Sequence, residues 1–461
     1  MSGKFEAVIS MKYTNTKILV IGAGISGIGA ARALAKAGAN VILSDVKDLS
    51  AEKTAALTAL GIECVFGAQK SSLLAGVEQI IMSPGIAPTI PLAVAATEAG
   101  IPVVSEIEVA YELSQAPIYA ITGTNGKTTT TTLLGDMVAA GGLKNVVGGN
   151  IGKALSEQVS ELSPDGIVVA EVSSFQLEMI DRFRPHVAAV LNITPDHFER
   201  HGDMDSYVQA KARIFENQTT DDVLILNAQD PYCRAFAEKA QSRILWVSTA
   251  GKVENGAYVE DNVLYLNANG VPEVLLSADE LLLKGEYNWL NILTASLMAQ
   301  HAGVPLSVIR GVLRVFKGLP HRVENVATQE GITYYNDSKA TNTDATIKAL
   351  QSFSQPLVWI AGGYDKGTDL TLLMQVARKC KGIVFLGNSK ERFSIAAQKE
   401  GISNIELAGD LAQAVKKAQK LAQKNNATVV LFSPAASSYD QYHNYQERGR
   451  DFCRLVAELE N

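Results

Sequence analysis

The sequence IYAITGTNGKTT occupies residues 118–129. Its first four residues, Ile118 to Ile121, read as a buried strand, and the glycine-rich loop that follows opens a helix. In such a loop backbone N–H groups cradle phosphates, Lys127 reaches the outer phosphates, and the Thr128 hydroxyl can bind Mg²⁺. This strand, loop and helix therefore predict an ATP-binding domain, although the loop is shorter than the common P-loop. The predicted ATP-contacting loop residues are Gly123, Thr124, Asn125, Gly126, Lys127, Thr128 and Thr129.

An acidic residue follows the next strand of this domain. The strand Gly166 to Ala170 delivers Glu171 at its carboxyl end, where open α/β sheets place residues that contact ligands. A lone glutamate is more often a helix cap or a solvated acid, but a strand end in a phosphate-binding domain favours Mg²⁺ binding. Glu171 is therefore a candidate metal ligand.

A third strand end brings basic residues toward the same edge. The strand Val187 to Asn192 runs into Asp196-His197, and a helix downstream carries Tyr207 and Lys211 one turn apart on one face. A lone histidine is more often structural and a lone lysine is usually solvated, so these residue types alone do not decide between site and surface. His197 and Lys211 are therefore candidate site residues.

The N-terminal region holds a second glycine-rich turn. Lys17 to Ile21 reads as a strand, Gly22 to Gly27 (GAGISG) as a tight turn, and Ile28 to Ala37 as a helix, and Asp45 ends the next strand. The pattern is typical of dinucleotide binding. Another nucleotide remains possible because such turns accept any phosphate at a helix N-terminus, and a purely structural turn is the third alternative.

The alternation of strands and helices breaks twice. One break follows Pro102 to Val104 and the predicted helix Glu106 to Leu113, and the other falls at Gly318-Leu319-Pro320. We therefore predict an α/β protein of three domains: a Rossmann-like domain over 1–106, a central P-loop ATPase-like domain over 107–318 and a Rossmann-like α/β domain over 319–461. The strands predicted in the last domain are Ile332 to Tyr335, Leu357 to Ala361, Gly382 to Leu386 and Thr428 to Phe432.

Composition excludes several classes of protein. The formal net charge is −7 and no long block of like charges occurs, so nucleic acid is not an expected partner. The four cysteines are far apart in the sequence, which favours a reducing cytoplasm over a secreted disulfide scaffold. No apolar segment predicts export or membrane insertion. We expect a cytoplasmic monomer.

The order of the motifs resembles the Mur ligase family over nearly the whole chain. The resemblance is carried by GxGxSG, GTNGKTT, Gly148-Gly149-Asn150-Ile151-Gly152, EVSSFQL from Glu171, Asp196-His197, GEYNWLN at 285–291, LPHRVE at 319–324 and NDSKATN at 336–342. Two further blocks, AGGYDKG at 361–367 and SPAASSYDQ at 433–441, are similar to those of members that add D-glutamate to UDP-N-acetylmuramoyl-L-alanine. The resemblance thus implies an ATP-dependent, amide-forming ligase.

The resemblance also assigns residues to ligands. It implies ATP and the first Mg²⁺ at Lys127, Thr128 and Glu171, and the second Mg²⁺ near His197 and a carbamylated Lys211. Lys127, His197 and Lys211 are the implied catalytic residues. The implied contacts to the UDP substrate are Ser26, Gly27, Asp45, Ser83, Gly85, Asn150, Ser173 and Gln176. The implied contacts to adenine and ribose are Asn288, Asn291, Arg322 and Asp337, and those to D-glutamate are Thr341, Lys366, Ser438 and Tyr445.

Two positions depart from the family pattern. Tyr287 stands where relatives commonly have His, and Tyr445 stands where Phe is common. Two rival functions rest on the isolated motifs. An NAD-dependent oxidoreductase would use the first glycine-rich turn and Asp45, and a P-loop switch or motor ATPase would use the second.

Overall fold

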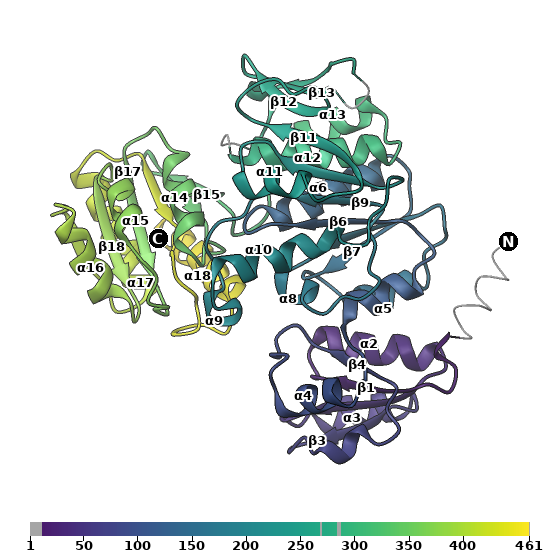
Figure 1. Ribbon diagram of the computed structural model, residues 1–461. Helices are drawn as coiled ribbons and strands as arrows, with labels where there is room; N and C mark the ends of the chain where they lie inside the picture. The colour runs from purple at the N-terminus through teal and green to yellow at the C-terminus, as the bar shows by residue number, and fades with distance from the viewer. Residues whose placement is uncertain (1–11, 268–269, 284–286, 461) are drawn as a thin grey trace. The chain divides into compact units, whose positions relative to one another are not determined.

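A computed structural model describes residues 12–267, 270–283 and 287–460, with the side chains of Tyr287 and Glu460 outside the described part. The chain forms two compact units. One contains the described residues of 1–281 together with 288–316, and the other contains those of 282–287 together with 317–461. Three sheets run through these units, two in the first and one in the second (Figure 1).

The N-terminal sheet is wholly parallel, with strand order β3-β2-β1-β4-β5. The strands are β1 (Lys17–Ile21), β2 (Asn40–Asp45), β3 (Glu63–Phe66), β4 (Gln79–Met82) and β5 (Val103–Ser105). The helices are α2 (Ile25–Lys36), α3 (Ala51–Thr58), α4 (Pro91–Glu98) and the short 3₁₀ helix η1 (Ser71–Leu74). The strand order reverses at β1, and this switch point is where open α/β sheets bind ligands.

The central sheet has the order β14-β13-β12-β11-β10-β9-β6-β8-β7. It is parallel from β7 to β12 and ends in an antiparallel meander. The strands are β6 (Ile118–Thr122), β7 (Asn145–Gly149), β8 (Ile167–Glu171), β9 (Val187–Val190), β10 (Val223–Asn227), β11 (Arg243–Ser248), β12 (Gly256–Glu260), β13 (Val263–Asn267) and β14 (Glu273–Ser277). The helices are α5 (Glu106–Leu113), α6 (Lys127–Ala140), α7 (Leu155–Val159), α8 (Ser174–Leu177), α9 (Phe198–His201), α10 (Met204–Ala212), η2 (Arg213–Phe215), α11 (Pro231–Ala237), η3 (Ala278–Glu280), α12 (Tyr287–His301) and α13 (Leu306–Val315).

The C-terminal sheet has the order β15-β16-β20-β17-β18-β19, and only the edge strand β15 is antiparallel to its neighbour. Its strands are β15 (Glu324–Gln329), β16 (Ile332–Asn336), β17 (Leu357–Gly362), β18 (Gly382–Leu386), β19 (Ile405–Leu407) and β20 (Val429–Phe432). Its helices are α14 (Thr343–Gln351), α15 (Thr371–Ala377), α16 (Lys390–Lys399), α17 (Leu411–Lys424), α18 (Tyr445–Ala457) and η4 (Glu458–Glu460).

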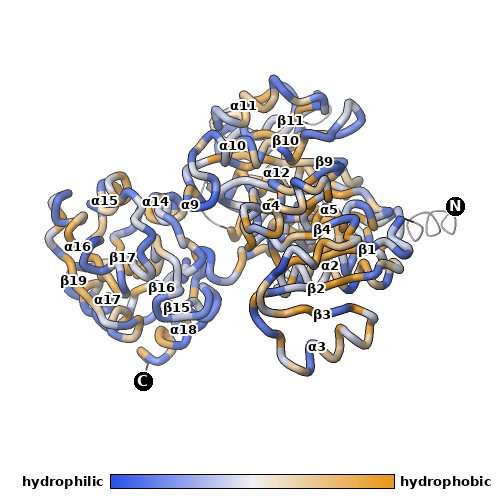
Figure 2. Tube along the Cα trace, turned by 60° about the horizontal axis from the view of Figure 1, so that its bottom comes forward, coloured by the Kyte–Doolittle hydropathy of each residue, from blue (hydrophilic) through white to orange (hydrophobic). Residues whose placement is uncertain are grey.

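The central parallel strands, such as β1, β6, β17 and β20, are largely apolar and buried, as expected where helices cover both faces of a parallel sheet. In β17, Val358 and Ile360 pack into one core, whereas Trp359 and Ala361 pack into the core on the opposite face. This alternation follows from the two-residue period of a strand. Figure 2 shows hydrophobic stretches along β1, β2 and β4, with hydrophilic segments between them.

The N-terminal and central domains pack against each other through α2, α5 and α7. A Cβ added at Gly29 would lie 2.3 Å from the Cβ of Ala154, so only glycine permits this approach. Nη1 of Arg32, on α2, donates to Oε1 of Glu157, on α7, at 3.2 Å. These contacts explain why the two domains form one unit. No helix in the described part of the chain is both long and apolar enough to cross a membrane.

Several boundaries differ from those predicted. The helix expected from Ile28 begins at Ile25, because the glycine-rich turn itself supplies the first helical turn. The strand expected to reach Asn192 ends at Val190, and Asn192 bonds to the phosphate loop instead of to a strand. The parallel strands β3, β7, β10, β11 and β19 were not predicted. The strands β12 to β15 were not predicted either, because they lack the alternation of strand and helix.

Candidate active site

The phosphate loop connects β6 to α6, as predicted. Gly126, with a φ of 89°, caps the helix, and a Cβ there would lie 2.2 Å from Oδ1 of Asn291. Glycine is therefore required both for the backbone conformation and for space. The Lys127 ammonium donates to the carbonyl oxygens of Gly123 at 2.8 Å and Thr124 at 2.9 Å. The Lys127 ammonium thus lies against the loop that is expected to bind the phosphates.

A second loop, residues 191–194 after β9, holds the phosphate loop in place. The Asn192 side chain accepts the backbone N–H of Asn125 at 2.9 Å and donates to its carbonyl at 3.0 Å. The Thr124 N–H donates to the carbonyl of Asn192 at 2.8 Å, and the Thr124 hydroxyl donates to that of Thr194 at 3.1 Å. Sequence reasoning missed Asn192, whose only signal was its place at the predicted end of a strand.

Glu171 ends β8, the neighbour of β6 in the sheet, and its Cα pairs in register with Ile121. The residue is 1% exposed. One carboxylate oxygen, Oε1, accepts from Nδ2 of Asn150 at 2.9 Å, and Oε2 has no hydrogen-bond partner among the described residues. A buried carboxylate oxygen without a donor is costly unless a cation or a donor completes it.

Lys211 lies on α10 and is 2% exposed. Its Nζ donates to the carbonyl of Gly123 at 2.9 Å and lies 4.8 Å from the centre of the Tyr207 ring. Burial, and secondly repulsion from Lys127, hold the pKa of Lys211 well below its ordinary value, while Asp196 and Glu171 oppose the shift. Lys211 and Tyr207 share a helix face as predicted, and the Tyr207 hydroxyl also contacts Oγ1 of Thr124 at 3.0 Å.

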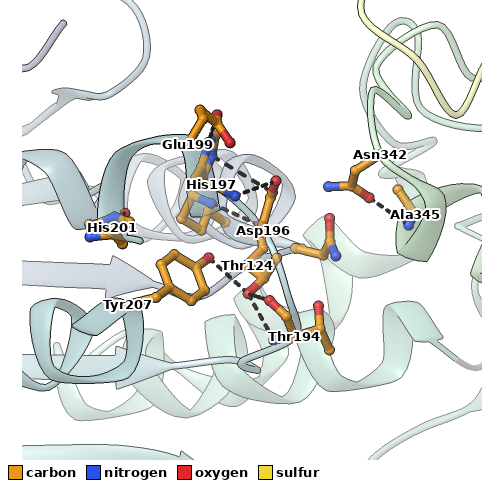
Figure 3. Close-up of polar contacts among 12 residues, drawn as sticks. Thr124, Thr194, Asp196, His197, Glu199, His201, Tyr207, Asn342 and Ala345 are labelled. Atoms are coloured by element: carbon orange, nitrogen blue, oxygen red, sulfur yellow. Dashed lines mark hydrogen bonds and ion pairs between the residues drawn. The ribbon is translucent and has the colours of Figure 1, made fainter. Parts of the chain in front are cut away.

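His197 adopts a left-handed conformation, with a φ of 56°, at the start of α9. Its backbone N–H donates to Oδ1 of Asp196 at 3.0 Å, and its ring lies 3.4 Å from Oε1 of Glu199 (Figure 3). The ring packs edge-on against Phe175 at 4.9 Å. The side chain keeps 37% of its surface exposed, so it remains accessible to a ligand.

The described residues contain no group of three or more His, Cys, Asp and Glu side chains that could hold a metal ion by themselves. Mg²⁺ commonly binds through one or two carboxylates together with substrate phosphates and water. The free Oε2 of buried Glu171 and the hydroxyl of Thr128, the second residue of α6, provide such an incomplete oxygen set. These residues therefore fit Mg²⁺ that arrives with a nucleotide.

The first glycine-rich turn is fixed by two side chains predicted to bind the substrate. Asp45 accepts the backbone N–H of Ala23 at 2.7 Å and that of Lys47 at 2.9 Å. The Ser83 hydroxyl donates to the carbonyl of Gly22 at 3.1 Å. A Cβ at Gly27 would lie 1.8 Å from that same carbonyl oxygen, so the turn requires glycine there. Ser26 is partly exposed beside it, and Gly85 is exposed.

The other three predicted substrate residues lie at strand ends of the central sheet. Asn150 follows β7 and bonds to Glu171. Ser173 and Gln176 form a capping box at the start of α8, in which each side chain bonds to the other residue's backbone N–H. Nε2 of Gln176 is buried without a hydrogen-bond partner among the described residues. This amide could donate to a ligand.

The predicted adenine and ribose residues fall in both units. In the first, Asn288 and Asn291 are buried on α12, where Asn291 accepts from the Thr130 hydroxyl of α6 at 3.3 Å. In the second, Arg322 lies between His321 and Val323, whose φ angles are 66° and 45°. A left-handed valine is strained, which is a feature of functional loops.

Asp337 follows β16 in the second unit and is 6% exposed. Its carboxylate accepts from the Ser433 hydroxyl at 2.7 Å and from the backbone N–H of Val323 at 3.3 Å. Burial raises the pKa of Asp337 to about 7, although the Ser433 hydrogen bond and the Arg322 charge favour ionisation. The structure thus links Asp337 to the strained loop that carries Arg322.

The predicted D-glutamate residues lie on loops at the carboxyl ends of the C-terminal strands. Thr341 is in the loop after β16, Lys366 is exposed in the loop after β17, and Ser438 is buried after β20. Tyr445 begins α18, and its hydroxyl accepts from the Lys339 ammonium at 3.0 Å. The hydroxyl that distinguishes Tyr445 from phenylalanine therefore has a defined contact. The other departure, the side chain of Tyr287, lies outside the described residues.

Three family models match the chain, each over one domain. They are the Mur ligase MurD-like N-terminal domain over residues 16–105, the Mur ligase middle domain over 121–299 and the Mur ligase glutamate ligase domain over 321–436. The three matches follow the order of the three sheets.

Individual relatives agree with these matches. A UDP-N-acetylmuramoylalanine–D-glutamate ligase of Thermoanaerobacter sp. is 42% identical over 454 residues, which cover 97% of this chain and 100% of the relative. The enzyme of that name from Pelotomaculum thermopropionicum is 42% identical over 450 residues, or 97% and 98% of the two chains. The solved pseudomurein peptide ligase type C of Methanothermus fervidus shares the fold, with a TM-score of 0.62 at 19% identity over 96% of this chain and 100% of that one. Because the sequence likeness covers 97% of the chain at this identity, the chain belongs to the Mur ligase family.

Proposed function

We propose that the protein is an ATP-dependent ligase that joins D-glutamate to UDP-N-acetylmuramoyl-L-alanine and releases ADP and phosphate. The reaction makes a peptidoglycan precursor. One observation supports it most directly: the adjacent strands β6 and β8 end in a phosphate loop and in a carboxylate oxygen without a donor, and helix α10 adds a buried lysine of lowered pKa that donates to this loop. The chain is also 42% identical over its length to enzymes with that name.

The first step would activate the L-alanyl carboxylate, because a carboxylate has no leaving group that an amine can displace. A carboxylate oxygen attacks the γ-phosphorus of ATP, the bond to the β,γ-bridging oxygen breaks, and an acyl phosphate and ADP result. Positioning and charge stabilisation supply nearly all the catalysis that such a transfer needs. Lys127, already placed on the loop by its bonds to Gly123 and Thr124, would turn toward the outer phosphates.

Bound Mg²⁺ would neutralise charge on the transferring phosphoryl oxygens. Thr128 and Glu171 would hold the first ion, and His197 and Lys211 would lie near the second. A lysine ammonium has no lone pair, but a neutral amine can add CO₂, lose a proton and become a carbamate with two oxygens suited to Mg²⁺. The lowered pKa of Lys211 supplies that neutral amine.

In the second step the D-glutamate amine would attack the acyl carbon, a tetrahedral intermediate would form, and phosphate would leave. Lys366 would pair with the side-chain carboxylate of D-glutamate, with Thr341, Ser438 and Tyr445 completing its contacts. His197, held in its left-handed turn by Asp196, would orient the amine.

The remaining assignments are part of the same proposal. Residues 1–106 would bind the UDP moiety, 107–318 ATP, and 319–461 the amino acid. The protein would act as a cytoplasmic monomer, without nucleic acid as a partner and without membrane insertion.

Phosphate release tests this function. Release should require ATP, Mg²⁺, UDP-N-acetylmuramoyl-L-alanine and D-glutamate together, and L-glutamate should not replace the D-isomer. Release that is indifferent to the amino acid would instead identify an ATPase of another kind. Binding of a nicotinamide cofactor would instead support the NAD-dependent oxidoreductase.

A further inference from the structure

The loop after β17 presents Lys366 between two residues that are firmly held. Lys366 is exposed, and among the described residues of this domain it has no hydrogen-bond or ion-pair partner. Its neighbours on both sides, Asp365 and Gly367, are joined by a hydrogen bond of 2.9 Å from the Gly367 N–H to Oδ1 of Asp365. The cation is therefore displayed on an ordered turn.

One arginine from α16 holds this turn. Nε and Nη2 of Arg392 donate to the two carboxylate oxygens of Asp365 at 2.6 and 2.7 Å, and Nη1 donates to the carbonyl of Thr368 at 3.0 Å. Such a planar, forked pair fixes orientation as well as charge, which a lysine at the same position would not do. Arg392 thus fixes the chain on both sides of Lys366.

The same helix anchors the base of the loop. Ser389, the residue before α16, accepts the backbone N–H of Gly363 at 3.1 Å with its hydroxyl and donates its own N–H to the carbonyl of Gly363 at 3.0 Å. The N–H of Tyr364 bonds to the carbonyl of Ser437 at 2.9 Å. The loop therefore has defined ends, and Arg392 fixes its tip.

The Arg392–Asp365 ion pair also controls the charge next to Lys366. Asp365 is adjacent to Lys366, so a free carboxylate there would compete for the ammonium and would repel an anionic substrate. Arg392 occupies both oxygens of Asp365 and holds the pKa of that carboxyl below its usual range. The ammonium of Lys366 is left for a carboxylate from outside.

We propose that Arg392 is a positioning residue for the amino-acid substrate: it fixes the Lys366 turn and prevents Asp365 from neutralising Lys366. The inference rests on the proposed function, in which Lys366 binds the side-chain carboxylate of D-glutamate. It adds that the Arg392–Asp365 ion pair keeps the Lys366 ammonium available for that carboxylate.

Steady-state kinetics of the Arg392→Ala variant test this positioning role of Arg392. The KM for D-glutamate should rise about tenfold, the usual effect of losing a charge-assisted contact, whereas the KM values for ATP and the UDP substrate should change less than about twofold. Arg392→Lys should rescue only part of the effect. Arg378→Ala is the matched control, because it breaks an arginine–carboxylate pair with Glu400 in the same domain, away from the turn.

A double variant separates the two roles of the pair. Adding Asp365→Asn to Arg392→Ala removes the carboxylate that would compete for Lys366, so the KM for D-glutamate should fall back part of the way. Equal changes in all three KM values, or an unchanged KM for D-glutamate, would overturn the inference.

Backbone amide exchange gives a readout that does not need turnover. Exchange at residues 363–368 should be faster in Arg392→Ala than in the wild type and in Arg378→Ala. Unchanged exchange there overturns the inference even if the enzyme is active. A wild type that exchanges slowly at this turn but shows no turnover dependent on D-glutamate would contradict the proposed function instead.

Discussion

At the scale of single residues, the surroundings of Lys211 and Glu171 differ from what their residue types suggest. Most lysines and glutamates are solvated, yet these two are 2% and 1% exposed. The sequence placed both near the phosphate loop, through strand ends and through family resemblance. It could not give their burial or the lowered pKa of Lys211, because these depend on neighbours from distant parts of the chain.

Lys211→Ala should lower kcat about 100-fold, in line with the loss of a group that supports a metal site. If the amine carries CO₂, wild-type turnover should also fall in CO₂-depleted buffer and recover with bicarbonate, while the residual rate of Lys211→Ala stays constant. Lys239→Ala, at an exposed lysine, should retain wild-type rates. Wild-type turnover in Lys211→Ala would exclude a catalytic role for this residue.

Glu171→Gln should weaken the apparent affinity for Mg²⁺, because an amide can replace the free Oε2 with a donor that repels a cation. A titration of turnover against Mg²⁺ should shift to concentrations higher by about tenfold or more. Glu161→Gln, at an exposed glutamate, serves as the control. Superimposable Mg²⁺ curves for wild type and Glu171→Gln would remove Glu171 from the metal site.

Asp337 predicts a pH dependence of stability. Its folded-state pKa of about 7 lies above the ordinary value of 3.8, so the folded protein retains a proton that the unfolded chain releases. The resulting stabilisation is complete below about pH 4 and is lost as the pH rises through about 7. Urea unfolding from pH 4 to 8 should therefore show a smaller decline for Asp337→Asn than for the wild type. Parallel declines would contradict the raised pKa.

At the scale of elements, the phosphate loop shows how much local pattern can predict. The strand, the loop and the helix starting at Lys127 follow from apolar runs and glycine positions. The bonds between this loop and residues 191–194 do not, because β6 and β9 are brought together only by the sheet. Asn192 was therefore predicted as part of a strand, whereas its side chain is one of the connections between the two loops.

Asn192→Ala should raise the KM for ATP about tenfold, because it removes two hydrogen bonds that hold the backbone of Asn125. Asn217→Ala is matched to it, since Asn217 also makes two side-chain bonds to backbone, to the carbonyls of Asp181 and Phe183. That control should leave the KM for ATP unchanged. If both substitutions raised the KM for ATP equally, the effect would come from general destabilisation of the domain and not from loss of the bonds between Asn192 and the phosphate loop.

At the scale of the whole molecule, the succession of strands and helices predicted three α/β domains, and the three sheets agree with that fold class. The sequence did not predict the parallel strands β3, β7, β10, β11 and β19. It also missed β12 to β15, because short strands joined by turns lack the alternation of strand and helix. The packing of α2 on α7 was also not predictable, since Gly29 and Ala154 are small residues with no pattern of their own.

The central claim is that this fold couples ATP cleavage to amide formation through an acyl phosphate. The most direct test uses UDP-N-acetylmuramoyl-L-alanine labelled with ¹⁸O in both oxygens of its alanyl carboxylate, with ATP, Mg²⁺ and D-glutamate, followed by mass spectrometry of both products. We predict one ¹⁸O atom in each phosphate released and a UDP product extended by one glutamyl residue. Unlabelled phosphate, or phosphate release without the extended product, would contradict the account.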